Sequence, residues 1–219
     1  MRVGVLADIH GNKVALEAVL EDLPSVDALV CAGDVVGYNP WHAECVEAVR
    51  EREIPTVMGN HDRAVASGGN FRFNSMAGAG IQHARDQLGD DQLEWLGALP
   101  EERWLFGDRV KVVHGHPDDP DHYTYPAEFT SGLLGEEDVL VMGHTHVQHH
   151  EVFDGQVALN PGSVGQPRDG NPKAAYAVLD LEELTVEERR VAYDVDRVVE
   201  AVREAGLPDR IGNRLKMGT

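Results

Sequence analysis

Five apolar runs in this sequence end in side chains that bind metals or move protons. The runs are residues 3–7, 28–32, 54–58, 110–113 and 139–142, and they are followed by Asp8 and His10, Asp34, Asn60 and His61, His114, and His144 and His146. A buried strand that ends this way presents its polar groups at the carboxyl edge of a sheet, where open α/β folds bind ligands. The recurrence predicts one shared site.

The residue types indicate a transition-metal site. Imidazole with carboxylate suits Mn²⁺, Fe²⁺, Ni²⁺, Co²⁺ or Zn²⁺. A carboxylate that offers one oxygen to each of two ions can bridge a pair about 3.5–4 Å apart. Asp34, alone at the end of its run, is the natural bridge. Each signal taken singly is more typical of a turn, a helix cap or a core histidine, and only their recurrence favours a metal centre.

The first part of the chain predicts parallel βαβ units. Asn12 can cap a helix that closes near Pro24, and a strand over residues 27–32 follows. A helix over residues 41–53 and a third strand over residues 54–58 complete the alternation.

The alternation then breaks at a predicted helical insert, about residues 63–100. The sequence predicts a loop at residues 67–70, a helix over residues 75–88 that Ser75 could cap, and a helix over residues 91–99. The insert is either a lid or wall for the substrate or packing on the flank of the sheet.

The remaining chain favours hairpins. Strand pairs are expected at residues 104–106 with 110–113, 150–153 with 156–160, and 174–181 with 185–193. These predict a second, antiparallel or mixed sheet. A closing helix over residues 194–204 and a loose tail over residues 207–219 complete a single domain, residues 1–219.

The chain is strongly acidic, with 38 Asp and Glu against 19 Lys and Arg in 219 residues. A formal charge of −19 disfavours bulk nucleic acid and anionic lipid as partners, and it suggests a halophilic source. No stretch is long and apolar enough for a membrane span. Met1 leads directly into a strand without a signal peptide, and Cys31 and Cys45 are interpreted as free thiols, so we expect a cytoplasmic protein.

At this point the sequence resembles the calcineurin-like metallophosphoesterases, over residues 3 to about 165. The matching blocks, in the family's order, are Asp8-Ile9-His10, Gly33-Asp34, Gly59-Asn60-His61-Asp62, His114-Gly115, Gly143-His144-Thr145-His146 and Asn160-Pro161-Gly162-Ser163. The resemblance is strongest to the small bacterial and archaeal phosphodiesterase-like members. It implies an α/β fold, a four-layer αββα sandwich of two mixed sheets flanked by helices.

The resemblance also implies the roles of individual residues. One ion would be held by Asp8, His10, Asp34 and His146, and the other by Asp34, Asn60, His114 and His144. His61 would act on the substrate as an imidazolium without binding a metal. Arg168 is a weaker candidate for a phosphate contact, with a surface salt bridge as the alternative. The roles of His116, Tyr123 and Tyr125 are left open; the tyrosines are either a stacking surface or a loop anchor.

The expected function is a dinuclear phosphoesterase that cleaves small phosphodiesters or phosphomonoesters by attack of a metal-bridging hydroxide. The expected cofactors are two divalent ions, with Mn²⁺ preferred and Fe, Ni²⁺, Co²⁺, Zn²⁺ or Mg²⁺ as alternatives. A dinucleoside polyphosphate hydrolase is the rival enzyme, and a non-catalytic protein-binding scaffold is the rival class. The natural substrate and the oligomeric state, including a homo-oligomer, are left open.

Overall fold

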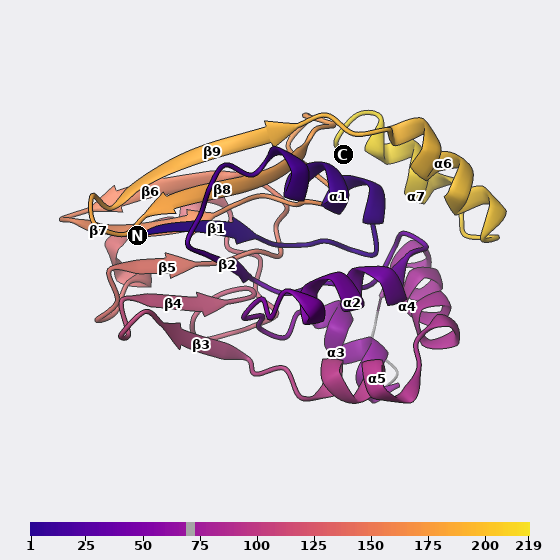
Figure 1. The fold of residues 1–219 in the computed structure, drawn as a ribbon, viewed down its shortest axis with the longest axis horizontal. Coiled ribbons are helices and arrows are strands. Elements are labelled where there is room, and N and C mark those ends of the chain that lie inside the picture. The colour runs from indigo at the N-terminus through magenta and orange to yellow at the C-terminus, as the bar shows by residue number, and fades with distance from the viewer. Residues whose placement is uncertain (69–72) are drawn as a thin grey trace.

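The computed structural model describes residues 1–68 and 73–219 and contains two mixed β-sheets (Figure 1). The first sheet has the order β2-β1-β8-β9, formed by Ala28–Cys31, Arg2–Leu6, Ala174–Asp180 and Thr185–Val191. The second has the order β3-β4-β5-β7-β6, formed by Glu102–Leu105, Val110–Val113, Val139–Val141, Gln156–Asn160 and His149–Phe153. The prediction of two mixed sheets flanked by helices is confirmed.

The central core lies between the two sheets. Val3 and Val5 of β1 join Val110 and Val139 of the second sheet in one buried cluster. Leu6 lies instead in the cluster that faces the helices. This division follows from the strand geometry, because successive side chains point to opposite faces of a sheet.

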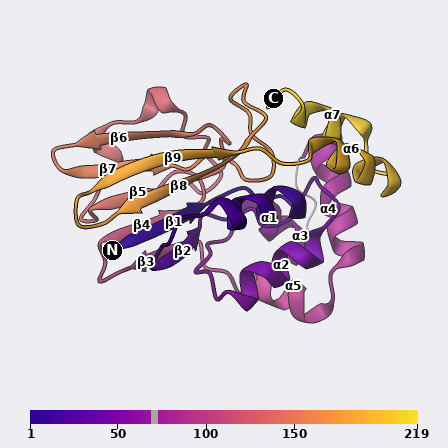
Figure 2. The same cartoon turned by 45° about the horizontal axis from the view of Figure 1, so that its top comes forward.

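Most helices gather beyond one end of the sheets (Figures 1 and 2). They are α1 (Lys13–Asp22), α2 (His42–Glu51), α3 (Asn60–Ser67), α4 (Ser75–Gln87), α5 (Asp90–Gly97), α6 (Val195–Glu204) and α7 (Asp209–Leu215). The outer face of the second sheet is covered differently. There, Phe129 and Leu133, in a segment with two short 3-10 turns (Pro126–Glu128 and Ser131–Leu133), pack on Leu140 and Met142.

Several local predictions are confirmed. The β1–α1–β2 unit is parallel, and the Asn12 Oδ1 caps α1 by accepting the Ala15 N–H at 3.1 Å. The three hairpins form as β3–β4, β6–β7 and β8–β9, each antiparallel. These elements were predictable because their hydrogen bonds are local in sequence.

The strand predicted over residues 54–58 is wrong. Only one parallel bridge, between Cys31 and Thr56, joins this segment to β2. Pro55 has no N–H to donate, and the Met58 N–H turns to the carbonyl of Pro100 instead of a neighbouring strand. The segment still runs beside β2 and delivers Asn60 to the sheet edge.

The predicted loose tail is also wrong. Residues 209–215 form α7, whose Ile211 and Leu215 are fully buried against α6. Gly212 permits this packing, because a Cβ there would lie 2.9 Å from the Cα of Val199. The tail is therefore anchored to the closing helix.

The predicted helical insert holds three helices among the described residues, with residues 69–72 outside them. The first, α3, was not predicted as a helix, and α4 is capped by Asn74 rather than Ser75. Gly80 of α4 packs on the backbone of Tyr38, where a Cβ would lie 2.2 Å from the Tyr38 nitrogen. The insert thus supports the loop that follows Asp34.

Among the described residues, no helix combines the length and the apolar character needed to cross a membrane. Cys31 and Cys45 are free and buried.

Candidate dinuclear metal site

The predicted residues meet where β1, β2, β4 and β5 end. Ligand atoms lie within 4.8 Å of one another in three groups: Asp8, His10 and His146; His10, Asp34 and His61; and Asp34, His114 and His144. All of these side chains are buried, whereas Asn60 is partly exposed. The first and third groups match the two predicted ligand sets, apart from the shared Asp34 of the first and Asn60 of the second.

Each of four histidines places one ring nitrogen beside a backbone carbonyl. The contacts are His10 Nδ1 with Val36 O at 3.1 Å, His114 Nδ1 with Ala32 O at 2.7 Å, His146 Nδ1 with Gln166 O at 2.6 Å, and His144 Nε2 with Asp121 O at 3.2 Å. A carbonyl can only accept, so the nitrogen beside it carries the proton. The other nitrogen of a neutral ring then presents a lone pair, as in metal-binding histidines.

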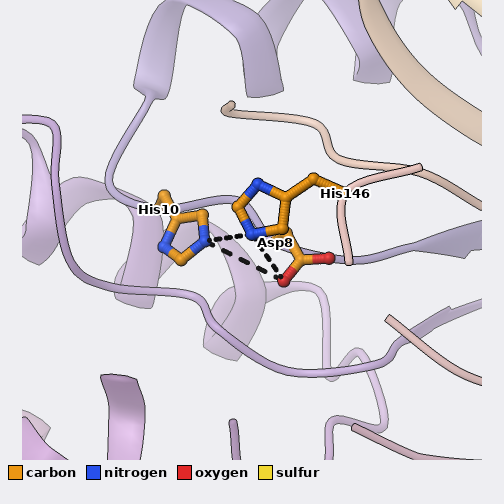
Figure 3. Close-up of side chains that lie close together, drawn as sticks. All are labelled: Asp8, His10 and His146. Carbon is orange, nitrogen blue, oxygen red and sulfur yellow. Dashed lines mark hydrogen bonds and ion pairs between the residues drawn. The ribbon is translucent and has the colours of Figure 1, made fainter. Parts of the chain in front are cut away.

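Two of these lone pairs face one another. The Nε2 atoms of His10 and His146 lie 3.0 Å apart, and both rings turn toward the Asp8 carboxylate (Figure 3). Burial holds the pKa of both histidines well below the usual value, so both are neutral. Two facing lone pairs repel unless a cation lies beside them. Asp8 Oδ1 lies 3.4 Å from the His146 Nε2, and its ionised carboxylate would supply the negative charge that such a cation needs.

The site has two halves, the first with Asp8, His10 and His146 and the second with His114 and His144. One oxygen of Asp34 lies between them. Its Oδ2 is 3.6 Å from His10 Nε2 and 3.4 Å from His114 Nε2. The other oxygen, Oδ1, accepts a hydrogen bond from the backbone N–H of His61 at 2.9 Å. Asn60 Oδ1 lies 3.2 Å from the His114 Nε2 and extends the second half. This geometry suits a carboxylate that bridges two ions through Oδ2.

The buried carboxylates of the site favour a nearby positive charge. Burial raises the pKa of Asp8 to about 8. Burial also opposes ionisation of Asp34, but His114 and His61 hold the Asp34 pKa well below its usual value. For His114, burial lowers the pKa and Asp34 outweighs it, so the value rises to about 10. A proton on His114 therefore neutralises part of the charge that metal ions would otherwise balance.

The backbone at the site is unusual. Five site residues have positive φ: Asp8 (54°), His10 (49°), Asp34 (54°), His144 (68°) and His146 (60°). This left-handed region is sparsely populated by residues other than glycine. Such strain persists where surrounding structure imposes it, and it clusters at functional sites.

Asp62 holds the loop that carries Asp34. Its fully buried carboxylate accepts four backbone N–H groups, from Asp34 (2.8 Å), Val35 (2.9 Å), Val36 (3.2 Å) and Gly59 (3.0 Å). Gly59 is required beside it, because a Cβ there would lie 2.0 Å from Asp34 Oδ1. Asp62 thus holds the backbone of Asp34 in place, while its own carboxylate binds N–H groups and not the candidate ligand atoms.

His61 lies against the first half of the site. Its ring is 4.8 Å from the rings of both His10 and Tyr38, measured between centroids. Gly37, with φ of 97°, makes room for it, because a Cβ there would lie 2.3 Å from His61 Nδ1. Burial lowers the pKa of His61 to about 4, which favours the neutral imidazole. The role of His61 as an imidazolium stays a prediction.

Arg168 lies at the rim of the site. Its guanidinium donates to Gln166 Oε1 at 2.8 Å and to the Tyr38 hydroxyl at 3.3 Å, and it lies over the Tyr38 ring. Its positive charge acts on Asp8, His10 and His146. In the described part of the chain, no carboxylate is within ion-pair distance of Arg168, so the alternative of a surface salt bridge is not found.

Sequence reasoning assigned no role to Asp62 or Tyr38. Their positions were a usable signal, because Asp62 belongs to the Gly59-Asn60-His61-Asp62 block and Tyr38 to the loop after Asp34. His116 does not join the ligand groups. Its Nδ1 accepts the N–H of Asp118 at 3.1 Å within a turn.

The donor set fits a pair of divalent ions. It combines carboxylate oxygens, an amide oxygen and imidazole nitrogens with fixed tautomers, which are the ligands of Mn²⁺, Fe²⁺, Ni²⁺, Co²⁺ and Zn²⁺ sites. A bound ion would also give the facing lone pairs of His10 Nε2 and His146 Nε2 a favourable partner.

The sequence and the fold are similar to those of known phosphoesterases. The Calcineurin-like phosphoesterase superfamily domain matches residues 1–184. The uncharacterized protein MJ0912 of Methanocaldococcus jannaschii is 32% identical, over 99% of this chain and 98% of its own. The phosphodiesterase YfcE of Escherichia coli is also 32% identical, over 85% of this chain and 91% of its own.

A crystal structure of a metallophosphoesterase from Sphaerobacter thermophilus superposes with a TM-score of 0.86 at 36% identity, and it covers 100% of this chain and 99% of its own. The family match spans well over half of the sequence, and it includes every predicted metal ligand. The prediction of a phosphoric ester hydrolase is confirmed at this level. The chain belongs to the calcineurin-like phosphoesterase superfamily.

Proposed function

We propose that this protein hydrolyses small phosphodiesters or phosphomonoesters at a site for two divalent metal ions. Asp8, His10, Asp34 and His146 would hold one ion, and Asp34, Asn60, His114 and His144 the other. The observation that carries the proposal is the shared Oδ2 of Asp34, which lies 3.6 Å from His10 Nε2 and 3.4 Å from His114 Nε2.

A charge count supports a phosphate substrate. Two dications bring four positive charges, and the carboxylates of Asp8 and Asp34 return two negative ones, because the other ligands are neutral. The loaded site is then net positive within a chain of formal charge −19. An anionic ester is attracted to this site and repelled by most of the remaining surface.

The chain's own residues divide the remaining work. Metal ions at such a site polarise phosphoryl oxygens and lower the pKa of water toward about 7. His61, neutral and packed on Tyr38, is placed to donate a hydrogen bond to a phosphoryl or leaving-group oxygen. Arg168 is placed to bind a non-bridging oxygen, because its present partners are neutral. Asp62 keeps Asp34 in position.

The test is a hydrolysis screen of the purified protein after removal and replacement of its metal. Mn²⁺ is expected to support the highest rate, and Fe, Ni²⁺, Co²⁺, Zn²⁺ and Mg²⁺ are the alternatives to compare. Substrates should include aryl and alkyl phosphodiesters, phosphomonoesters and diadenosine tetraphosphate. Metal-dependent cleavage of simple esters supports the proposal.

Two other outcomes would contradict it. A clear preference for diadenosine tetraphosphate over simple diesters would favour a dinucleoside polyphosphate hydrolase. Full metal loading without cleavage of any ester would favour a protein-binding scaffold. The cytoplasmic location and the halophilic origin stay predictions, and the oligomeric state stays open.

A further inference from the structure

A series of three nearly parallel rings leads outward from the second half of the metal site. The ring of Tyr123 stacks on that of His144, with centroids 3.8 Å apart and planes 24° apart. The ring of Tyr125 lies 6.2 Å from that of Tyr123, with planes only 16° apart. The stack therefore begins on a candidate metal ligand and continues toward solvent.

Both tyrosines keep a large exposed surface. Tyr123 is 41% exposed and Tyr125 is 48% exposed. Exposed aromatic rings beside a site that binds phosphate can stack with a further planar ring. An exposed ring could instead serve only to anchor its loop.

The loop does not need the Tyr125 ring as an anchor. Glu128 Oε2 accepts the Tyr125 N–H at 2.9 Å, and the Glu128 N–H donates to the Tyr125 carbonyl at 2.8 Å. The other carboxylate oxygen of Glu128 lies 2.7 Å from His122 Nε2. These contacts fix the backbone that carries Tyr125 without using its side chain, so less of the loop has to be ordered when a ligand binds.

Arg168 borders the same metal site. It donates to the Tyr38 hydroxyl at 3.3 Å. The Tyr38 ring lies 4.9 Å from that of His10, measured between centroids, so Arg168 lies at the rim of the metal site. A cation for phosphate oxygens and an aromatic surface therefore border the same metal site.

We propose that Tyr123 and Tyr125 form a stacking platform for a planar aromatic group attached to the phosphate. The preferred substrate class is then an aromatic phosphoester of small size, with nucleotides as members. This inference rests on the proposed function, because the metal site must hold the phosphate. The formal charge of −19 restricts the ligand to small molecules and disfavours long nucleic acids.

The test compares two phosphates that differ only in the base. Binding of adenosine 5′-monophosphate and of ribose 5-phosphate to the Mn²⁺-loaded protein is measured by isothermal titration calorimetry. Stacking of one base predicts that the wild type binds the nucleotide roughly five- to hundredfold more tightly. Tyr125→Leu should reduce this ratio to about twofold or less, whereas Tyr125→Phe, which keeps the ring, should retain it.

The outcomes separate the platform from the metal site. Equal binding of both phosphates by the wild type would overturn the platform and leave the proposed function standing. An unchanged ratio in Tyr125→Leu would also overturn it, provided that circular dichroism shows a folded variant. Failure of both phosphates to bind would overturn both proposals. The ratio of kcat/KM for aryl over alkyl diesters should fall in parallel in Tyr125→Leu.

Discussion

The Nε2 atoms of His10 and His146 face one another across 3.0 Å, although these residues are 136 positions apart in the sequence. Each ring is turned this way because its Nδ1 donates to a backbone carbonyl, of Val36 and of Gln166. The protein thus brings two lone pairs together at a place that only a cation makes favourable. The folded chain is prepared to bind a metal by backbone groups that do not contact it.

Asp34→Asn tests the bridging role. The variant keeps the shape of the side chain but removes its charge and one oxygen, so one acceptor must be lost toward an ion or toward the His61 N–H. We expect the bound metal to fall from two ions per chain to one or none, measured by elemental analysis after dialysis. Asp154→Asn, in the β6–β7 turn, is the matched control and should keep both ions. Unchanged metal content in Asp34→Asn would refute the bridge.

His61→Ala tests the assignment of a residue that acts on the substrate. His61 lies beside His10 and Asp34 but is absent from the proposed ligand sets. Metal content should stay at the wild-type level, while kcat falls roughly 10²- to 10⁴-fold. His150→Ala is the control, since His150 lies on β6 and contacts Glu188. Loss of metal in His61→Ala would show that this residue is a ligand, and full activity would remove it from the reaction.

Asp62→Asn tests the support of the Asp34 loop. An amide has one accepting oxygen, so some of the four N–H groups that Asp62 now binds would face an NH₂ group. Each buried donor left without an acceptor costs about 1–3 kcal/mol. We expect the free energy of unfolding in urea, measured on metal-free protein, to be at least about 2 kcal/mol lower in Asp62→Asn than in the wild type. We also expect the variant to bind Mn²⁺ more weakly. Asp138→Asn, at a half-exposed carboxylate beside Arg109, should change metal binding little.

The buried His42 should make the stability of the folded protein depend on pH. Burial, with the nearby His83, lowers the pKa of His42 to about 3, while its Nδ1 accepts the N–H of Gly37. Between pH 6.5 and 3 the unfolded chain therefore holds the additional proton, and stability falls as the pH falls, by up to about 1.4 kcal/mol per pH unit. His42→Asn keeps an acceptor near Gly37 but cannot titrate.

The check on His42 is urea unfolding of metal-free protein from pH 7 to pH 4. The free energy of unfolding should decline less steeply in His42→Asn than in the wild type. A His150→Asn control should follow the wild-type slope. Equal slopes in His42→Asn and the wild type would show that His42 does not contribute this acid sensitivity.

The sequence predicted that the candidate site residues lie together, and their roles as metal ligands stay predictions. Asp8, Asp34 and His114 each lie within three residues of the end of a strand, so hydrophobic patterning placed them at strand ends, although these strands belong to two sheets. The carbonyls of Ala32 and Gln166, which fix the tautomers, were not predictable, because every residue has a carbonyl and only the fold decides where it points.

The missed elements have physical reasons. Helix α3 begins with Asn60 and His61, whose polar side chains face the site, so it lacks the usual apolar start. Helix α7 has only seven residues, and its burial depends on contacts with α6 that are not evident in its own sequence. Pro55 and its neighbours resemble a buried strand in composition, but they bond to β2 through a single bridge.

Anomalous X-ray diffraction from crystals grown with Mn²⁺ tests the central claim most directly. Two anomalous peaks about 3.5–4 Å apart are expected, one beside Asp8, His10 and His146, the other beside Asn60, His114 and His144, with Asp34 between them. No peak at this cluster at saturating Mn²⁺, or peaks only at surface carboxylates away from Asp34, would contradict the account.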